Sequence, residues 1–279
     1  VDPERRSFVI GLLTATIGVG ILTVGVGTNV IRAALDDDGL WRPVWALQAA
    51  IAFMLFLLMV TVVRQERTPP VDSGGVNLSL LRTLPSWWQI TLAYSLYAIA
   101  GGGFFAFVVA AVEQDGGLSR GGATAVFAVM GLAGAVAAPI TGRLSDAFGR
   151  RPVMLASVGA VAVAAMAVAF GGQATVVVGA VLFGSVAGSF PTQVATYVRD
   201  HAEARVFAGA FATMLLFFSV AAIVAPTLVG WLADLSGSFT LPFATLAAIA
   251  MVIIAIVLRL PESARHVSSP EPTDPVLRQ

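Results

Sequence analysis

Residues 142–154, GRLSDAFGRRPVM, separate two long apolar runs at residues 124–140 and 153–170. Four charged side chains fall within this short segment: Arg143, Asp146, Arg150 and Arg151. Because an unpaired charge is costly in hydrocarbon, the segment is predicted to be a short loop at a membrane face. Gly142 and Gly149 would permit the tight turns that a short helix–helix connection needs.

The composition indicates an integral membrane protein. Of the 279 residues, 57% are hydrophobic and 11% are charged, and the mean hydropathy is +0.88. A soluble domain would carry roughly 25% charged residues. Apolar runs long enough to cross a bilayer predict an all-α, polytopic transmembrane helical bundle with about eight spans, embedded in lipid. The predicted spans cover residues 8–33, 43–63, 88–112, 120–141, 153–170, 174–197, 206–230 and 239–259.

The composition also argues against several function classes. There is no Cys, and the two His, His201 and His266, lie outside the apolar runs. We therefore expect no metal site, no cofactor and no enzyme activity, since paired catalytic groups at membrane depth are lacking. Basic and acidic residues balance at 16 each, which gives no support for a nucleic-acid partner.

The arginines predict the orientation. With the N-terminus inside, thirteen of the sixteen Arg fall in inner loops or ends, as the positive-inside rule requires. The outer positions are Arg32, Arg42 and Arg120. We expect a multi-pass protein of the cell (plasma or inner) membrane with both termini cytoplasmic.

A charged and proline-containing segment divides the chain. Residues 64–87 are predicted to form a cytoplasmic central loop, with a short amphipathic helix on the inner membrane surface. Its apolar face would hold Val76, Leu80, Leu81 and Leu84. The loop separates residues 1–63, with two spans, from residues 88–260, with six. The polar, Pro-rich residues 261–279 are predicted to be a disordered cytoplasmic tail.

Two short patterns recur at nearly one spacing. E-x-R-x-F occurs at residues 4–8 and again at 203–207, an offset of 203 − 4 = 199. D-x-x-G-x, followed by an aromatic residue, occurs at residues 36–41 and 234–239, an offset of 234 − 36 = 198. The first pair of spans is therefore interpreted as a repeat of the last pair, as in transporters built from parallel repeats.

The pattern G-x-L-S-D-x-x-G-R-R-x-x-M of residues 142–154 resembles motif A of the major facilitator superfamily. Ala147 departs from it, because many members carry a basic residue there. The ending Leu260-Pro261-Glu262-Ser263 is also similar to the sequence after the last helix in that family. The resemblance implies two six-helix halves, so residues 1–63 would be the last two helices of the N-terminal half. Residues 88–260 would be the complete C-terminal half, with about four of twelve spans expected ahead of Val1.

The same resemblance implies a secondary active transporter that works by alternating access on a small-molecule substrate, as a monomer, and coupled to an ion or a proton. A non-transporting receptor or assembly subunit on the same fold stays open as an alternative. Glu113 is the one carboxylate near a span that could couple to a proton, and a solvated interfacial charge is the simpler interpretation.

For the motif segment, the resemblance implies a cytoplasmic gate made of Gly142, Asp146, Gly149, Arg150, Arg151 and Arg199. Asp146 would lie near Arg199 and face the start of the first span, around residues 2–8. Arg150 and Arg151 would contact lipid head groups or the ends of neighbouring helices. The alternative is that Asp146 only caps the helix that follows.

Four polar residues on two spans are the candidate substrate site: Tyr94, Tyr97, Thr192 and Gln193. Both spans resemble cavity-lining helices of the family, and buried hydroxyls and amides need partners that a polar substrate could supply. Hydrogen bonds between helices could supply them equally well. Gly101, Gly102 and Gly103 could either break the third span or allow close helix packing.

Overall fold

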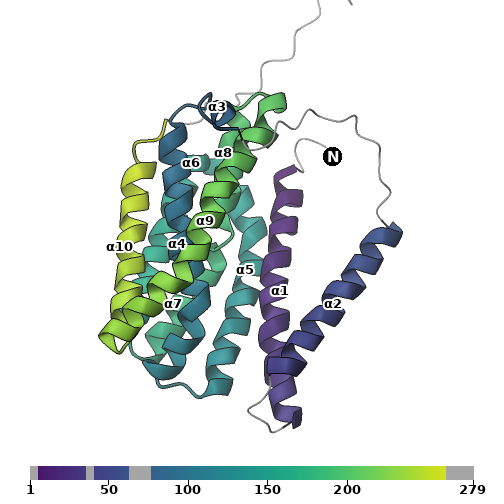
Figure 1. Cartoon of the computed structure of the whole chain (residues 1–279), viewed down its shortest axis with the longest axis vertical. Coiled ribbons are helices and arrows are strands. Elements are labelled where there is room, and N and C mark those ends of the chain that lie inside the picture. Colours follow the sequence, from purple (N-terminus) through teal and green to yellow (C-terminus); the bar gives the residue numbers. More distant parts are fainter. Residues whose placement is uncertain (1–5, 36–40, 63–76, 262–279) are drawn as a thin grey trace, which may run out of the picture.

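The computed structural model describes residues 6–35, 41–62 and 77–261, and every regular element in these ranges is helical. The predicted disordered tail and most of the predicted central loop lie outside them. Figure 1 shows the long helices side by side along one axis, with α2 inclined away from the rest. The helices are α1 (Arg6–Leu35), α2 (Trp41–Val62), α3 (Leu78–Leu81), α4 (Trp87–Gln114), α5 (Arg120–Phe148), α6 (Arg150–Phe170), α7 (Gln173–Val186), α8 (Ser189–His201), α9 (Ala204–Ser236) and α10 (Thr240–Val257).

Eight segments of the described residues are long and apolar enough to cross a membrane, which confirms the predicted all-α membrane bundle. Seven of them are single helices, and the eighth, Gln173–His201, contains both α7 and α8. The spans are helical because each backbone N–H and C=O in hydrocarbon must be satisfied inside the segment itself.

The connection between α5 and α6 is much shorter than predicted. Residues 142–148 continue α5, and α6 begins at Arg150, so Gly149 alone joins the two helices. Gly149 has φ 92° and ψ 169°, a backbone conformation that side chains disfavour. The expectation of a turn at Gly142 is wrong, because Gly142 lies inside α5. We call the end of the bundle that carries Gly149 the motif end.

The interrupted span is not the one that contains the glycine triplet Gly101, Gly102 and Gly103. α4 runs unbroken through Gly103, where a Cβ would lie 2.7 Å from Val229 of α9. The triplet therefore serves close packing, one of the two alternatives. The predicted sixth span is instead interrupted at Ala187 and Gly188, between α7 and α8. Pro191 follows, and its missing N–H cannot complete a continuous helix there.

Small residues bring α1, α5 and α7 into close contact. A Cβ on Gly25 of α1 would lie 2.7 Å from Ala128 of α5, and one on Gly18 would collide with the backbone at Gly131. α5 is equally close to α7, since a Cβ on Gly134 would lie 2.8 Å from the Gly184 carbonyl oxygen. Gly184 and Gly188 form a small-xxx-small pattern in the sequence, and at Gly184 the helices approach closely, as such patterns allow.

The apolar face of the central loop packs on protein. In the short helix α3 and just after it, Leu81 and Leu84 are buried in the same core as α4. The Asn77 N–H donates to the Thr213 hydroxyl of α9 at 2.8 Å. The expectation that these leucines rest on the membrane surface is therefore wrong, and α3 instead closes the motif end of the bundle over α9 (Figure 1).

Replacing Gly184 with Ala should destabilise the bundle. Its Cβ would meet the Met130 backbone and side chain, so we expect a loss of about 1–3 kcal/mol from overpacking. Gly159→Ala in α6 is the matched control, because a Cβ there meets nothing within 4 Å. Thermal unfolding in detergent measures both, and equal melting temperatures for the two variants would contradict the close contact.

Candidate functional site

A cavity of about 810 Å³ lies between α1, α4, α5, the α7–α8 break and α9. Arg199 and Phe207 line it at the motif end, and Ala222 lines it deepest along α9. Phe207 and Ala222 are fifteen positions apart, which corresponds to ~22 Å of helix. The cavity therefore reaches from the motif end to well inside the bundle.

Three of the four predicted site residues line this cavity: Tyr94, Tyr97 and Thr192. Gln193 does not. Its side chain is only 2% exposed, and its Oε1 accepts a 2.5 Å hydrogen bond from the Ser145 hydroxyl of α5. For Gln193 the structure thus shows the helix-to-helix hydrogen bond, the alternative to a substrate contact.

Tyr97 stabilises the break in the sixth span. In a continuous helix the Ala187 carbonyl would accept from the N–H of residue 191, but that residue is Pro191. The Tyr97 hydroxyl of α4 donates to the Ala187 carbonyl at 2.7 Å instead. The Tyr97 ring also stacks on Phe190, with centroids 4.8 Å apart. The hydroxyl therefore satisfies a backbone group that hydrocarbon would leave unpaired.

Aromatic side chains from α9 complete the cavity wall near Tyr94. The Tyr94 ring packs on Phe218, with centroids 4.4 Å apart, and lies 6.5 Å from the Phe211 ring. The sequence analysis missed both phenylalanines, because nothing in an apolar span indicates which of its faces meets a cavity. Their large, rigid rings make this side of the cavity aromatic.

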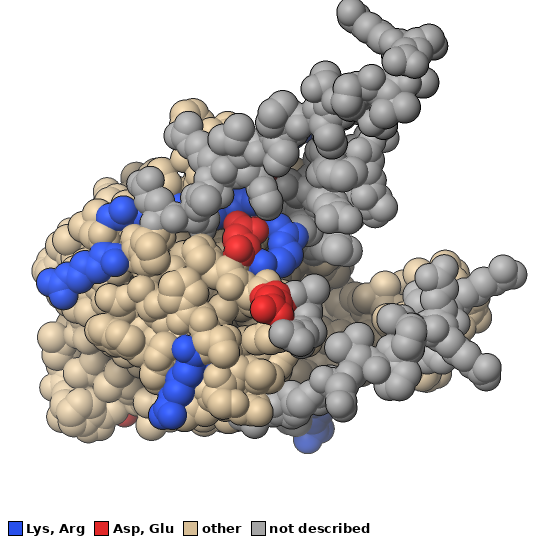
Figure 2. Space-filling view, turned by 90° about the horizontal axis from the view of Figure 1, so that it is seen from above, with Lys and Arg blue, Asp and Glu red and all other residues tan. Residues whose placement is uncertain are grey.

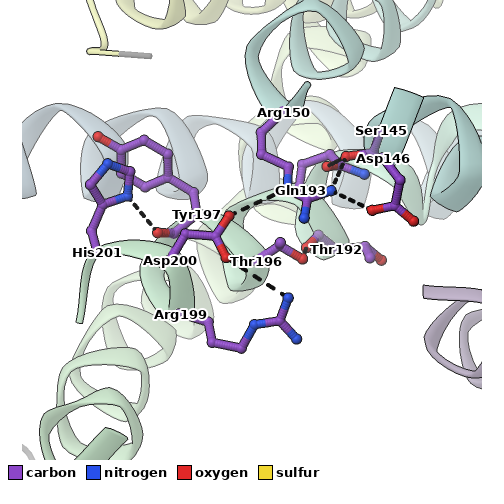
Figure 3. Close-up of polar contacts among 10 residues, drawn as sticks. All are labelled: Ser145, Asp146, Arg150, Thr192, Gln193, Thr196, Tyr197, Arg199, Asp200 and His201. Carbon is purple, nitrogen blue, oxygen red and sulfur yellow. Dashed lines mark hydrogen bonds and ion pairs between the residues drawn. The ribbon is translucent and has the colours of Figure 1, made fainter. Parts of the chain in front are cut away.

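A polar network connects α5, α6 and α8 at the motif end, next to the cavity (Figure 3). Arg150 is its centre: it donates to the Ser145 hydroxyl at 2.9 Å and pairs with Asp146 at 2.8 Å. It also pairs with Asp200 of α8 at 3.4 Å. Since Ser145 also binds Gln193, the motif residues of α5 and α6 are joined to α8 by both charge and hydrogen bonds.

The structure places the remaining gate candidates around this network. Arg199 lies 3.9 Å from Asp200, so Arg150 and Asp200 stand between Asp146 and Arg199 in the network. The Arg151 guanidinium donates to the Leu258 carbonyl at the C-terminus of α10, where a cation is favoured. The expected partner of Asp146 at residues 2–5 lies outside the described residues, so the gate itself stays a prediction.

Charge is distributed unequally between the two ends. At the motif end the described side chains include six arginines and three acidic residues: Arg82, Arg143, Arg150, Arg151, Arg199, Arg259, Asp146, Asp200 and Glu203. Figure 2 views this end and shows basic side chains around two acidic groups. At the opposite end the described side chains include three arginines and three acidic residues: Arg32, Arg42, Arg120, Glu113, Asp115 and Asp234.

At that opposite end two of the acidic residues have structural partners. Glu113 pairs with Arg120 at 3.1 Å. An Asp115 carboxylate oxygen accepts from the Phe239 N–H at 2.6 Å, which ties the α4–α5 turn to the start of α10. In the part of the chain that the structure describes, no three His, Cys, Asp or Glu side chains come together as they would in a metal site.

The family of this chain is identified by a match to a protein-family model. The model described as "Major Facilitator Superfamily" matches residues 90–278, about two thirds of the sequence. The chain belongs to the Major Facilitator Superfamily. It is thus a multi-pass membrane transporter and not an enzyme.

Solved structures of this superfamily share the fold. The crystal structure of the E. coli fucose:proton symporter FucP matches with a TM-score of 0.66 at 15% identity. The match covers 92% of this chain and 69% of that one. At this identity the likeness shows the fold alone. A search of curated proteins returned no match.

The Tyr97 hydroxyl should contribute to the stability of this superfamily member. Tyr97→Phe leaves the Ala187 carbonyl without its donor, so we expect a loss of about 1 kcal/mol or somewhat more in unfolding free energy. Tyr197→Phe is the control, since the buried Tyr197 hydroxyl has no hydrogen-bond partner among the described residues. Denaturant titration in detergent tests this; a stability loss that is no larger for Tyr97→Phe than for the control would contradict the role.

Proposed function

We propose that the chain is a secondary active transporter that moves a small solute by alternating access. The cavity carries this proposal. It extends from one end of the bundle past the α7–α8 break, and it is bounded by helices that approach one another through glycine. A binding site near the middle of the membrane, next to an interrupted helix, is what transporters of this kind use.

The motif end is proposed to be cytoplasmic. It carries twice as many described arginines as the opposite end, and the surplus there is not balanced by acidic residues. This orientation places both termini in the cytoplasm and suits a plasma-membrane protein. The cavity, with Arg199 at its mouth, would then open toward the cytoplasm.

Gating is assigned in this proposal to the Arg150 network. Asp146, Arg150 and Asp200 hold α5, α6 and α8 together, so this end of the bundle would move as a unit. In the closed state Asp146 would face the start of the first span, around residues 2–8, as the resemblance to motif A implies.

Proton coupling is a further element of the proposal, supported by the structural likeness to the fucose:proton symporter. Of the described residues that line the cavity, none is Asp, Glu or His. The Glu113 carboxylate is paired with Arg120 at the opposite end. A coupling carboxylate would therefore have to come from outside the described cavity wall. We propose a monomer as the working unit.

Sided labelling of a cavity cysteine tests alternating access. The chain has no Cys, so Thr196→Cys introduces a single thiol into the cavity wall. In proteoliposomes we expect an impermeant methanethiosulfonate to label it from the motif side and, more slowly, from the opposite side. Val136→Cys, whose α5 position is 60% exposed on an apolar surface, is the control and should resist labelling. Labelling of Thr196→Cys from one side only would favour a non-transporting receptor.

A second experiment tests the orientation. Ala147→Cys places a thiol on the exposed surface at the motif end, and Ser236→Cys places one at the opposite end. In intact cells, an impermeant maleimide added outside should label Ser236→Cys and spare Ala147→Cys until the cells are permeabilised. The reverse pattern would place the motif end outside.

A further inference from the structure

The chemistry of the cavity wall limits what it can bind. Among its described residues the only side chain that is charged at neutral pH is Arg199, at the motif end, and Asp200 lies 3.9 Å from it. No Asp, Glu, Asn, Gln, His or Lys lines the rest. The wall thus lacks a counter-charge for a cation, and it lacks the amide and carboxylate groups that bind several hydroxyls at once.

Most hydroxyl groups in the wall already donate a hydrogen bond to another group of the protein. Tyr97 donates to Ala187, as described above, and four further side chains donate to backbone carbonyls of their own helices at 2.7–3.0 Å. These four are Thr141, Ser185, Thr192 and Thr196. The Ser189 hydroxyl, also in the wall, is bonded to the Ser157 hydroxyl at 2.8 Å, and because Ser157 donates its own proton to the Val153 carbonyl, Ser189 is the donor in that bond. A hydroxyl has one proton, so these groups have only acceptor lone pairs left for a ligand.

Tyr94 differs from them. No hydrogen bond of its hydroxyl is present within the described residues, although Tyr94 lines the cavity. Its ring is held between α4 and α9 by Phe218 and Phe211. The Tyr94 hydroxyl is therefore a donor without a partner, set in an aromatic surface and positioned by packing.

We propose that the cavity takes a neutral, largely apolar aromatic solute with one hydrogen-bond acceptor, which the Tyr94 hydroxyl binds while Phe211 and Phe218 contact the ring. The proposal rests on the transport function proposed above and names its substrate class. An apolar pocket with few polar groups that set orientation is the usual design of a small-molecule site. A sugar or a zwitterion would leave several of its own polar groups unpaired here, at a large cost in affinity.

Protection of the Thr196→Cys thiol measures this binding in the full chain. Two probes of similar shape are compared: 2-acetylnaphthalene, which has a carbonyl acceptor, and 2-isopropylnaphthalene, which has none. For each probe we record the concentration that halves the labelling rate. The ratio of the two concentrations is then compared between variants, so that partition of the probes into lipid cancels.

The ratio of the two half-protection concentrations should change in Tyr94→Phe and stay constant in the other variants. Removing the Tyr94 hydroxyl with Tyr94→Phe should weaken protection by 2-acetylnaphthalene about five- to tenfold and leave 2-isopropylnaphthalene unchanged. Tyr197→Phe is the matched control and should keep the parent ratio, since Tyr197 does not line the cavity. Phe218→Leu should weaken protection by both probes alike, which tests the aromatic contact without touching the hydroxyl.

Three results would overturn the inference: the same ratio in Tyr94→Phe as in Tyr197→Phe, full protection by both probes in Phe218→Leu, or protection by glucose or tetramethylammonium at concentrations at which 2-acetylnaphthalene fails. None of them affects two-sided labelling of Thr196→Cys, which tests transport. Failure of the substrate class and failure of the transport function are therefore distinguishable.

Discussion

The Ala187 carbonyl is the group on which the arrangement of the cavity depends. A carbonyl oxygen in hydrocarbon must find a donor, and Pro191 removes the one that helix geometry would supply. Tyr97 reaches across from α4 and donates at 2.7 Å. The interruption between α7 and α8 is thereby stabilised, and α4 is held against it. The same bond occupies the Tyr97 hydroxyl, whereas the Tyr94 hydroxyl has no hydrogen-bond partner among the described residues.

Glycine explains why a cavity exists beside this break. Gly101, Gly102, Gly134, Gly184 and Gly188 all line it and have no side chains to fill it. Where α5 meets α1 and α7, the glycines also let the backbones approach closely, which strengthens dispersion contacts without any hydrophobic driving force between helices in lipid. The same residue type thus holds the wall together and leaves the space inside it.

Charge is kept at the ends, where water and head groups reach it. At the motif end the Arg150 guanidinium contacts Asp146, Ser145 and Asp200. A guanidinium has several N–H donors and can therefore bind several acceptors at once. Half-exposed ion pairs of this kind contribute little to stability individually. These ion pairs instead fix the position of α8 relative to the turn at Gly149.

Hydropathy was sufficient to predict the spans, and residues 142–154 were sufficient to indicate the superfamily, because burial in lipid and the motif pattern are local properties of the chain. Packing between distant helices decided the rest. Gln193 and Thr192 are neighbours on α8, yet one binds Ser145 and the other faces the cavity, since adjacent helical positions point about 100° apart. The glycine triplet was a possible break point of the third span. Only the contact of Gly103 with α9, and the reach of Tyr97 to Ala187, determined which span is interrupted.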